Sequence, residues 1–214
     1  MLLHQLFENS LPMDAASRMK RAKELGFTVR AYHGTNAEFN EFDIEKGKAH
    51  HSGFAPHFTD DESEATGYAK SRNDGRRDNV RVMSVLLRIR KPFVVGRLFD
   101  TNKTIAPEIY KLVTGGHLPD KSRRERYMTA HNAIEHAMDV HYDETGNYNR
   151  KAIWTKIYDR LKKAGYDAII WEDTPSDYSN NANYTKIVML DMTGIRLETA
   201  AFDPAMSNSP SLTA

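Results

Sequence analysis

Residues 30–35 read Arg-Ala-Tyr-His-Gly-Thr, and the rest of the chain is interpreted outward from this segment. Residues 29–32 form a short apolar and aromatic run, which predicts a β-strand that delivers His33 into a break at Gly34 and Thr35. A glycine there lets the backbone bend and lets another group come close to its N–H and C=O groups. The imidazole and the hydroxyl beside it both donate and accept hydrogen bonds, which suits recognition of an amide or a ribose.

A second segment, residues 56–71, predicts a short strand, a helix cap and a helix. The strand is Pro-His-Phe-Thr, and the helix runs from about residue 62 to residue 71. On this helix Tyr68 shares one face with two alanines, so its ring has room to line a cleft. A half-buried helical tyrosine with a satisfied hydroxyl is the structural alternative. The N-cap is one of three neighbouring residues with suitable side chains: Thr59, Asp60 or Asp61.

The composition favours one globular domain with a sizeable core. The chain has 214 residues, of which 40% are hydrophobic and 28% charged. Its 30 basic and 29 acidic residues nearly cancel, which argues against binding through a globally basic surface. The absence of cysteine excludes a disulfide scaffold, a zinc–thiolate site and thiol catalysis.

The N-terminal residues predict neither a secretion signal nor a membrane anchor. Residues 1–8 are only briefly apolar and lack a basic start and a cleavage site. No run of 18 apolar residues exists anywhere in the chain, so we expect no transmembrane segment and no membrane partner. We therefore expect a soluble protein that acts in the cytoplasm of the cell that makes it or receives it.

The remaining pattern predicts alternating helices and strands, hence an α+β fold. Helices are expected over 15–25, 105–113, 121–141 and 153–164, and strands over 80–95, 166–171, 185–191 and 195–197. We divide the chain into a helical lead-in (1–28), one domain (29–204) with a helical insertion (97–150), and a flexible tail (205–214). Loops are expected over 45–55 and 173–183. We expect no metal, because His50 and His51 have no third spaced ligand and the histidines at 131, 136 and 141 do not share a helix face.

Taken in order, these segments resemble the NAD-dependent ADP-ribosyltransferases of the diphtheria-toxin and poly(ADP-ribose) polymerase type, whose triad is His, Tyr and Glu. In that family a strand carries Tyr-His-Gly-Thr, and a later Tyr-Phe-x-Asp opens a helix with Ala-x-x-Tyr. Flanking segments are similar to ADP-ribosyltransferase domains in multidomain proteins of phages and mobile elements. These flanking segments are residues 11–14, 16–19, 165–170 and 200–204.

The resemblance implies a fold in which split antiparallel β-sheets and flanking helices surround an NAD cleft. It implies that His33 binds the adenosine-side ribose, and that the backbone of Gly34, with Thr35 beside it, holds the nicotinamide carboxamide. Tyr68 would stack on the nicotinamide ring. His57 and Phe58 stand where the family has Tyr-Phe, so they are expected to contact the cofactor as well.

The third triad position departs from the family pattern. The family's Glu precedes the strand that matches residues 186–191, and Thr185 is the nearest residue there. We expect Thr185 to occupy the catalytic position, with Glu172 as a substitute only if the loop between them folds back over the cleft. Loss of the carboxylate predicts transfer of single ADP-ribose units rather than polymer growth.

Four functions are compatible with this sequence. The leading one is a mono-ADP-ribosyltransferase that uses NAD as its substrate and a protein or nucleic acid as acceptor. An NAD glycohydrolase with water as acceptor is the second, and RNA 2′-phosphotransferase-like chemistry on the same fold is the most distant. The other alternative is a catalytically weak module that binds NAD, ADP-ribose or a partner protein, which the missing Glu favours and the intact His33, Gly34, Thr35 and Tyr68 oppose.

Overall fold

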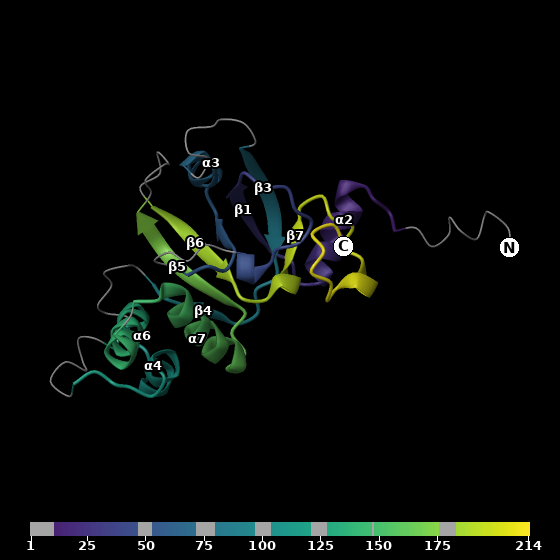
Figure 1. Ribbon diagram of the computed structural model, residues 1–214. Coiled ribbons are helices and arrows are strands. Elements are labelled where there is room, and N and C mark those ends of the chain that lie inside the picture. Colours follow the sequence, from purple (N-terminus) through teal and green to yellow (C-terminus); the bar gives the residue numbers. More distant parts are fainter. Residues whose placement is uncertain are drawn as a thin grey trace.

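The computed structural model describes residues 11–46, 53–71, 80–96, 104–120, 128–146, 148–175 and 183–214. Seven strands in these ranges form one curled sheet in the order β4-β5-β6-β2-β1-β3-β7 (Figure 1). Its neighbouring strands are antiparallel except for the parallel pair β4 and β5. The predicted α+β class is confirmed. The strands are β1 (Val29–Thr35), β2 (His57–Thr59), β3 (Arg81–Leu87), β4 (Pro92–Val94), β5 (Ala168–Pro175), β6 (Asn183–Met189) and β7 (Ile195–Leu197).

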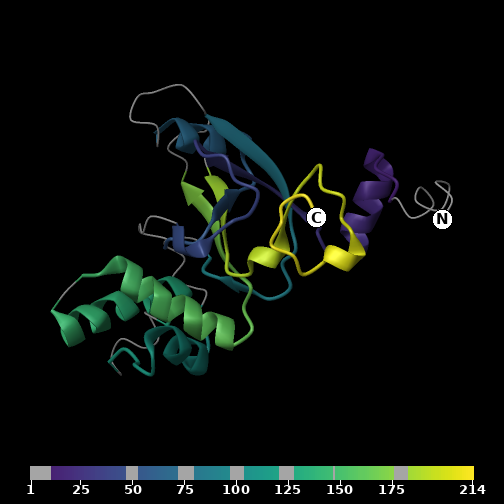
Figure 2. The same cartoon turned by 45° about the vertical axis from the view of Figure 1, so that its right-hand side comes forward.

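The sheet is pinched between β1 and β2. These two strands share one register pair, Tyr32 with Thr59, whereas β1 and β3 share seven and β2 and β6 share three. Strands β1, β3 and β7 therefore form one part of the sheet and β2, β6, β5 and β4 the other. Figure 2 shows the two parts curling away from each other.

Strand β1 continues through Gly34 and Thr35, so the predicted break at these residues is wrong. Gly34 pairs with Val82 and Thr35 with Arg81 of β3. Glycine is needed at position 34 for a different reason, the close approach of helix α3 (Glu62–Ser71). A Cβ atom on Gly34 would lie 1.9 Å from the carbonyl oxygen of Ala65, so only glycine lets α3 pack this closely against β1.

Helix α3 has the predicted bounds, and Asp61 is its cap. The Asp61 Oδ1 atom accepts hydrogen bonds from the backbone N–H of Ser63 at 2.8 Å and of Glu64 at 3.0 Å. The side chain thus satisfies two of the amide groups that a helix start leaves without backbone partners. Because the cap directly follows β2, the orientation of α3 is fixed relative to the pinch in the sheet.

Strands β5 and β6 both differ from their predicted bounds. β5 runs on to Pro175 and β6 begins at Asn183, so the predicted loop between them is shortened; residues 176–182 lie outside the described ranges. Trp171 pairs with Lys186, and Thr174 pairs with Tyr184. Two residues of β5 therefore lie opposite one residue of β6, which is a β-bulge.

The chain termini that the structure describes pack together at the β7 end of the sheet. Helix α2 (Ala15–Glu24) begins at the predicted cap, where the Asp14 side chain accepts the N–H of Ser17 at 2.9 Å. The last ten residues were expected to be flexible, but the structure places them against the sheet. Leu212 is 1% exposed, its N–H bonds the Asn40 carbonyl, and its carbonyl accepts the N–H of Leu197. Burial of this one apolar side chain and pairing of its backbone account for the difference.

At the other end, three helices form a cluster against β4 and β5 (Figure 1). They are α4 (Pro107–Thr114), α6 (Ala130–Thr145) and α7 (Arg150–Lys163), so the cluster includes more than the predicted insertion. α6 begins after its cap Thr129, and the predicted helical residues 121–127 lie outside the described ranges. The fully buried Trp154 of α7 packs beside Trp171 of β5, which joins the cluster to the sheet.

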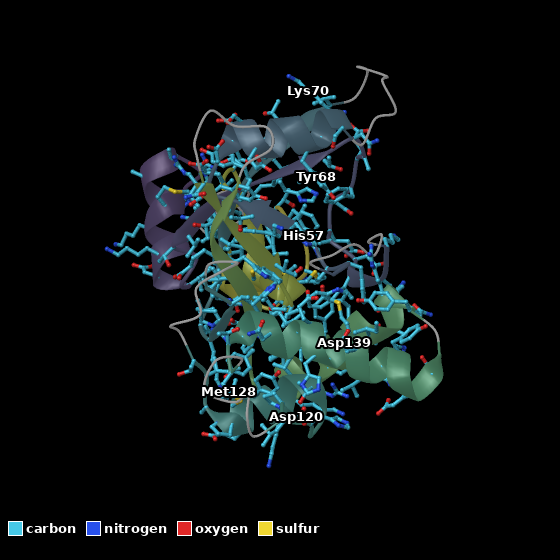
Figure 3. The ribbon with its side chains drawn as sticks, turned by 90° about the vertical axis from the view of Figure 1, so that its left-hand side faces the viewer. His57, Tyr68, Lys70, Asp120, Met128 and Asp139 are labelled. Carbon is cyan, nitrogen blue, oxygen red and sulfur yellow. The ribbon has the colours of Figure 1, made fainter. Side chains whose placement is uncertain are left out.

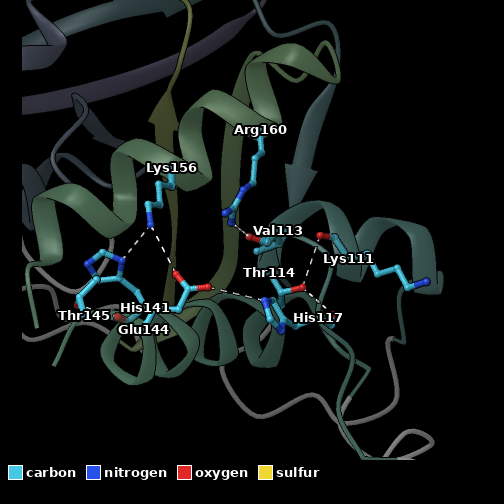
Figure 4. Close-up of polar contacts among 9 residues, drawn as sticks. All are labelled: Lys111, Val113, Thr114, His117, His141, Glu144, Thr145, Lys156 and Arg160. Atoms are coloured by element: carbon cyan, nitrogen blue, oxygen red, sulfur yellow. Dashed lines mark hydrogen bonds and ion pairs between the residues drawn. The ribbon is translucent and has the colours of Figure 1, made fainter. Parts of the chain in front are cut away.

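Polar side chains also link the three helices, as Figure 4 shows. Nη1 of Arg160 in α7 donates to the carbonyl of Val113 in α4 at 2.8 Å. The Glu144 carboxylate of α6 lies 3.9 Å from Lys156 Nζ and 4.0 Å from His117 Nε2. The side chains of Glu144, Lys156 and His117 are about half exposed, so these ion pairs orient the helices more than they stabilise them.

Candidate active site

A cleft of about 460 Å³ opens at the pinch in the sheet. Its walls come from β1, from the segment after β1, from the segment that enters β2, and from α3. Figure 3 shows Tyr68 on α3 and His57 below it on the same side of the molecule. The lining residues are His33, Gly34, Thr35, Asn36, Ala37, Glu38, Phe39, Glu41, Phe42, Asp43, Lys46, Phe54, Ala55, Pro56, His57 and Tyr68.

His33 bridges the two parts of the sheet. Its Nδ1 atom lies 2.7 Å from the backbone carbonyl oxygen of His57. A carbonyl only accepts, so Nδ1 carries the hydrogen in this bond, and in the uncharged ring Nε2 is the acceptor nitrogen. This bond sets both the tautomer and the direction of the imidazole in the cleft.

Three phenylalanines surround the His33 ring. The ring centroids lie 4.9 Å from Phe42, 5.4 Å from Phe58 and 6.2 Å from Phe39. Such packing restricts the imidazole to one rotamer and shields one side of it from water. An imidazole fixed in this way suits recognition of the hydroxyl groups of a ribose.

Gly34, Thr35 and Tyr68 all lie in the same cleft as His33. Gly34 has α3 packed against it, so the strand and the helix that carries Tyr68 meet at this residue. The Thr35 hydroxyl accepts the N–H of Ala37 at 3.1 Å and turns the chain into the next segment. Tyr68 is half-buried, so the predicted aromatic wall and a hydrogen-bonded packing residue are both compatible with its position.

Two predicted cofactor contacts differ in their placement. His57 lines the cleft. Phe58 is 2% exposed and does not line the cleft; it packs behind the His33 ring and against Phe42. Its position gives it a supporting role, because its ring is packed against the His33 imidazole and against Phe42 in the core.

Thr185 lies on β6, outside the residues that line the cleft. Its N–H donates to Asp60 Oδ1 at 2.8 Å, and its carbonyl accepts the N–H of Asp60 at 3.4 Å. The bulge of β5 that contains Glu172 faces Thr185 across the ladder. The sequence pattern pointed to Thr185 but did not predict its hydrogen bonds with Asp60.

Sequence reasoning missed part of the cleft wall, the segment between β1 and the short 3₁₀ helix η1 (Ile44–Lys46). From the sequence, two aromatic residues three apart on a turn predict anchors to the core and no contact with a ligand, and this applies to Phe39 and Phe42. Phe42 is 8% exposed and does pack in the core, but both rings also line the cleft. Two aromatic residues three apart, directly after the His-Gly-Thr segment, were the available signal.

Neither a metal site nor a membrane span is found within the described ranges. No group of three or more His, Asp or Glu side chains there is arranged to hold a metal ion. His50 and His51 lie outside those ranges. Every helix in the described part of the chain is too short or too polar to cross a bilayer.

The family assignment agrees with this geometry. The family described as ADP-ribosyltransferase in polyvalent proteins matches residues 24–205. The chain belongs to this family. No curated protein and no solved structure gives a significant match. The ADP-ribosyltransferase domain therefore spans all seven strands of the sheet, the cleft and the helical cluster, and the resemblance to ADP-ribosyltransferase domains is confirmed.

Proposed function

We propose that this protein transfers single ADP-ribose units from NAD to a macromolecular acceptor and releases nicotinamide. The observation that carries the proposal is the meeting of His33, Gly34 and Tyr68 in one cleft. Two of these residues come from β1 and one from α3, and the close contact at Gly34 holds the two elements together. The family assignment supports ADP-ribosyl transfer as the reaction class.

The cleft supplies a separate group for each part of the cofactor. His33 binds the adenosine-side ribose through its fixed ring, while His57 contacts the cofactor from the opposite wall. The backbone of Gly34, with Thr35 beside it, holds the carboxamide. Tyr68 stacks on the nicotinamide, where an aromatic face favours the cationic pyridinium ring.

The reaction exchanges one bond at C1′ of the ribose. The bond from C1′ to the nicotinamide nitrogen breaks, and its electron pair leaves with neutral nicotinamide. The ribosyl cation that develops is attacked by a nucleophilic group X–H of the acceptor, which forms the C1′–X bond and loses its proton. The products are ADP-ribosyl-X, nicotinamide and one proton.

Transfer stops after one unit because Thr185 stands at the third triad position. Its hydroxyl cannot take a negative charge at neutral pH and so cannot activate a further ribose hydroxyl as the next acceptor. The acceptor is a protein or a nucleic acid, and the helical insertion over 97–150, within the domain at 29–204, selects it. We place the reaction in the cytoplasm of the producing or recipient cell, as a toxin-like activity of a phage or mobile element.

The test uses NAD labelled on its adenylate phosphate, incubated with the protein and, separately, with cell protein, RNA and DNA. Label on one class of macromolecule, lost in His33→Ala and in Tyr68→Ala, establishes the transferase and names the acceptor class. Label appearing only in free ADP-ribose identifies a glycohydrolase instead. NAD that binds without being consumed identifies a binding module, which the absence of a carboxylate at position 185 favours among the alternatives.

A further inference from the structure

The cleft and the helical cluster share a wall. It is made of residues 53–57, which lead into β2 and which we call the wall segment. Four of its residues line the cleft: Phe54, Ala55, Pro56 and His57. Phe54 and Ala55 are 3% and 1% exposed, and both also pack in the apolar core that contains α7. The wall segment therefore contacts the cleft and the helical cluster at once.

The hydroxyl of Tyr158 in α7 holds the start of the wall segment. Its oxygen accepts the backbone N–H of Phe54 at 3.1 Å and that of Ala55 at 3.4 Å. Tyr158 is 2% exposed, and its ring centroid lies 5.1 Å from that of Phe54. Two buried backbone amides thus depend on one side-chain oxygen, and loss of an acceptor is costly at such a position.

A glycine lets the wall segment come this close to α7. Gly53 has φ +103°, and a Cβ atom there would lie 1.6 Å from the Tyr158 hydroxyl oxygen and 3.3 Å from the ring of Trp154. Any side chain at position 53 would push the wall segment away from the hydroxyl. The contact therefore depends on both partners, a tyrosine on α7 and a glycine on the wall segment.

The other end of the wall segment holds His33. The carbonyl of His57 accepts the Nδ1–H of the imidazole at 2.7 Å. Only Pro56 lies between Ala55 and His57, so the two contacts are about 7 Å apart along an extended chain. The proline ring fixes φ at position 56, which leaves little freedom to absorb a shift. A displacement at the Tyr158 hydroxyl is therefore passed to the carbonyl that orients His33.

We propose that Tyr158 is a positioning residue for NAD binding. Its hydroxyl holds the wall segment, and the wall segment places the carbonyl that orients the imidazole of His33. This inference rests on the proposed function, in which His33 binds the adenosine-side ribose. Gly34 and Tyr68, assigned to the nicotinamide end, are carried by β1 and α3. Loss of the hydroxyl should therefore affect cofactor binding more than bond cleavage.

Tyr158→Phe tests the role of the hydroxyl. This substitution removes one oxygen and keeps the ring, whose centroid lies 5.4 Å from that of Trp154. We expect the Kd for NAD to rise about 5- to 10-fold in calorimetric titration, the effect of one lost hydrogen bond. The KM for NAD should rise by the same factor, while kcat stays within about threefold of the unsubstituted protein.

Tyr110→Phe is the matched control. Tyr110 is a 1% exposed tyrosine of the same core. Its hydroxyl donates to the carbonyl of Asn132 at 3.3 Å and lies 3.1 Å from His136 Nδ1, both on α6. This variant also loses a bonded hydroxyl but leaves the wall segment untouched. The two variants should lose similar thermal stability, and only Tyr158→Phe should change NAD affinity by more than about twofold.

Two further measurements follow the route from Tyr158 to His33. Without NAD, the amides of Phe54 and Ala55 should exchange hydrogen at least about tenfold faster in Tyr158→Phe than in the unsubstituted protein, and should be unchanged in Tyr110→Phe. In a His33→Ala background, Tyr158→Phe should weaken NAD binding by less than about twofold, because the imidazole that it positions is gone.

Unchanged NAD affinity in Tyr158→Phe would overturn the inference, as would an equal loss in Tyr110→Phe. Unchanged exchange of the two amides would show that the hydroxyl does not hold the wall segment. A full loss of affinity in the His33→Ala background would overturn the route through His33. If the unsubstituted protein binds no NAD, the proposed function fails and the inference with it. That failure is distinguishable, because amide exchange is measured without NAD and the affinity comparisons require a parent that binds it.

Discussion

The Nδ1–H of His33 donates to the backbone carbonyl of His57 at 2.7 Å, across the place where the sheet is pinched. The two strands share one register pair there, so this bond adds a side-chain connection where the backbone ladder is weakest. One imidazole thus joins the two parts of the sheet and lines the cleft between them. The NAD binding proposed for His33 and the attachment of β1 to β2 are therefore coupled at this residue.

His33→Asn separates these two roles. The asparagine amide reaches the position of Nδ1 and still donates to the His57 carbonyl, but it has no atom in the place of Nε2. We expect NAD affinity to fall at least about tenfold in both His33→Asn and His33→Ala, the equivalent of one lost hydrogen bond of about 1.4 kcal/mol. Calorimetric titration with NAD measures the affinity.

Denaturant unfolding measures how each His33 variant changes the stability of the protein. His33→Ala removes the donor to a part-buried carbonyl and should cost about 1–3 kcal/mol of unfolding free energy, while His33→Asn should cost less. Equal destabilisation by both variants would contradict the bridging role of the imidazole.

Gly34→Ala tests the contact between β1 and α3. A Cβ atom there would lie 1.9 Å from the Ala65 carbonyl oxygen and 3.1 Å from the Ala69 nitrogen, so the helix must shift. We expect a loss of about 2–3 kcal/mol of unfolding free energy from overpacking, together with weaker NAD binding because Tyr68 moves with α3. Both are read from denaturant unfolding and NAD titration.

Gly146→Ala is the control for this substitution. Gly146 caps α6 at φ +65° with no atom within 4 Å of a Cβ, so alanine there adds backbone strain without a clash. It should destabilise the protein by about 1 kcal/mol and leave NAD affinity unchanged. Unaltered NAD binding in Gly34→Ala would show that α3 does not position the Tyr68 ring.

Local patterns predicted the elements of the site well. The bounds of α3 follow from a capping aspartate and a helical apolar face, and β1 follows from its apolar and aromatic run. The pattern predicted a close approach at Gly34 but not which group comes close, because that group is a helix carbonyl about thirty residues away in the chain. The bond between Asp60 and Thr185 was hidden for the same reason, since 125 residues separate its partners.

The packed C-terminal segment shows a further limit of composition. Residues 205–214 contain three serines, an asparagine and a proline, which favours a flexible tail, yet a single leucine and a few backbone bonds hold them in place. Composition averages over such a segment, whereas its order depends on one buried side chain.

Leu212→Ala tests this attachment. Leu212 is 1% exposed and packs in the same core as Phe42 of the cleft wall. Truncation of a buried leucine costs about 2–5 kcal/mol of unfolding free energy. Met206→Ala, at a side chain that is 45% exposed, should cost less than about 0.5 kcal/mol. Faster proteolysis at the C-terminus of Leu212→Ala but not of Met206→Ala is the expected readout; equal resistance in both would show that Leu212 does not hold the segment.

The helical cluster should lose stability at alkaline pH. Burial, and secondarily the nearby Asp139 charge, raises the pKa of Tyr110 to about 12, above its ordinary value of 10. The pKa of Tyr110 is higher in the folded state than in the unfolded state. The stability that this tyrosine contributes is therefore complete below pH 10 and is lost as the pH rises from 10 toward 12. Between pH 10 and 12, we expect the free energy of unfolding of Tyr110→Phe to fall by about 1–2 kcal/mol less than that of the unsubstituted protein. Denaturant unfolding at a series of pH values measures this difference.

Tyr142→Phe is the matched control for that series. Tyr142 is 52% exposed on the neighbouring helix, so its substitution should leave the slope of stability against pH unchanged between pH 10 and 12. Parallel curves for Tyr110→Phe and the unsubstituted protein would refute the effect of burial on Tyr110.

Substitutions of Phe39 and Phe42 in the wall of the cleft should affect different properties. Phe42 should matter mainly for stability, and Phe39 mainly for NAD binding. Phe42 is 8% exposed and contacts His33 and Phe58, so Phe42→Ala should cost about 3–5 kcal/mol of unfolding free energy. Phe39 is only partly buried, and Phe39→Ala should cost about 1 kcal/mol or less while weakening NAD binding several-fold, because it exposes one edge of the His33 ring. Phe39→Leu keeps the apolar contact and should recover most of the affinity. If Phe39→Ala binds NAD like the unsubstituted protein, the cofactor does not extend along this wall, and the ribose site assigned to His33 would have to lie on the Tyr68 side of the ring.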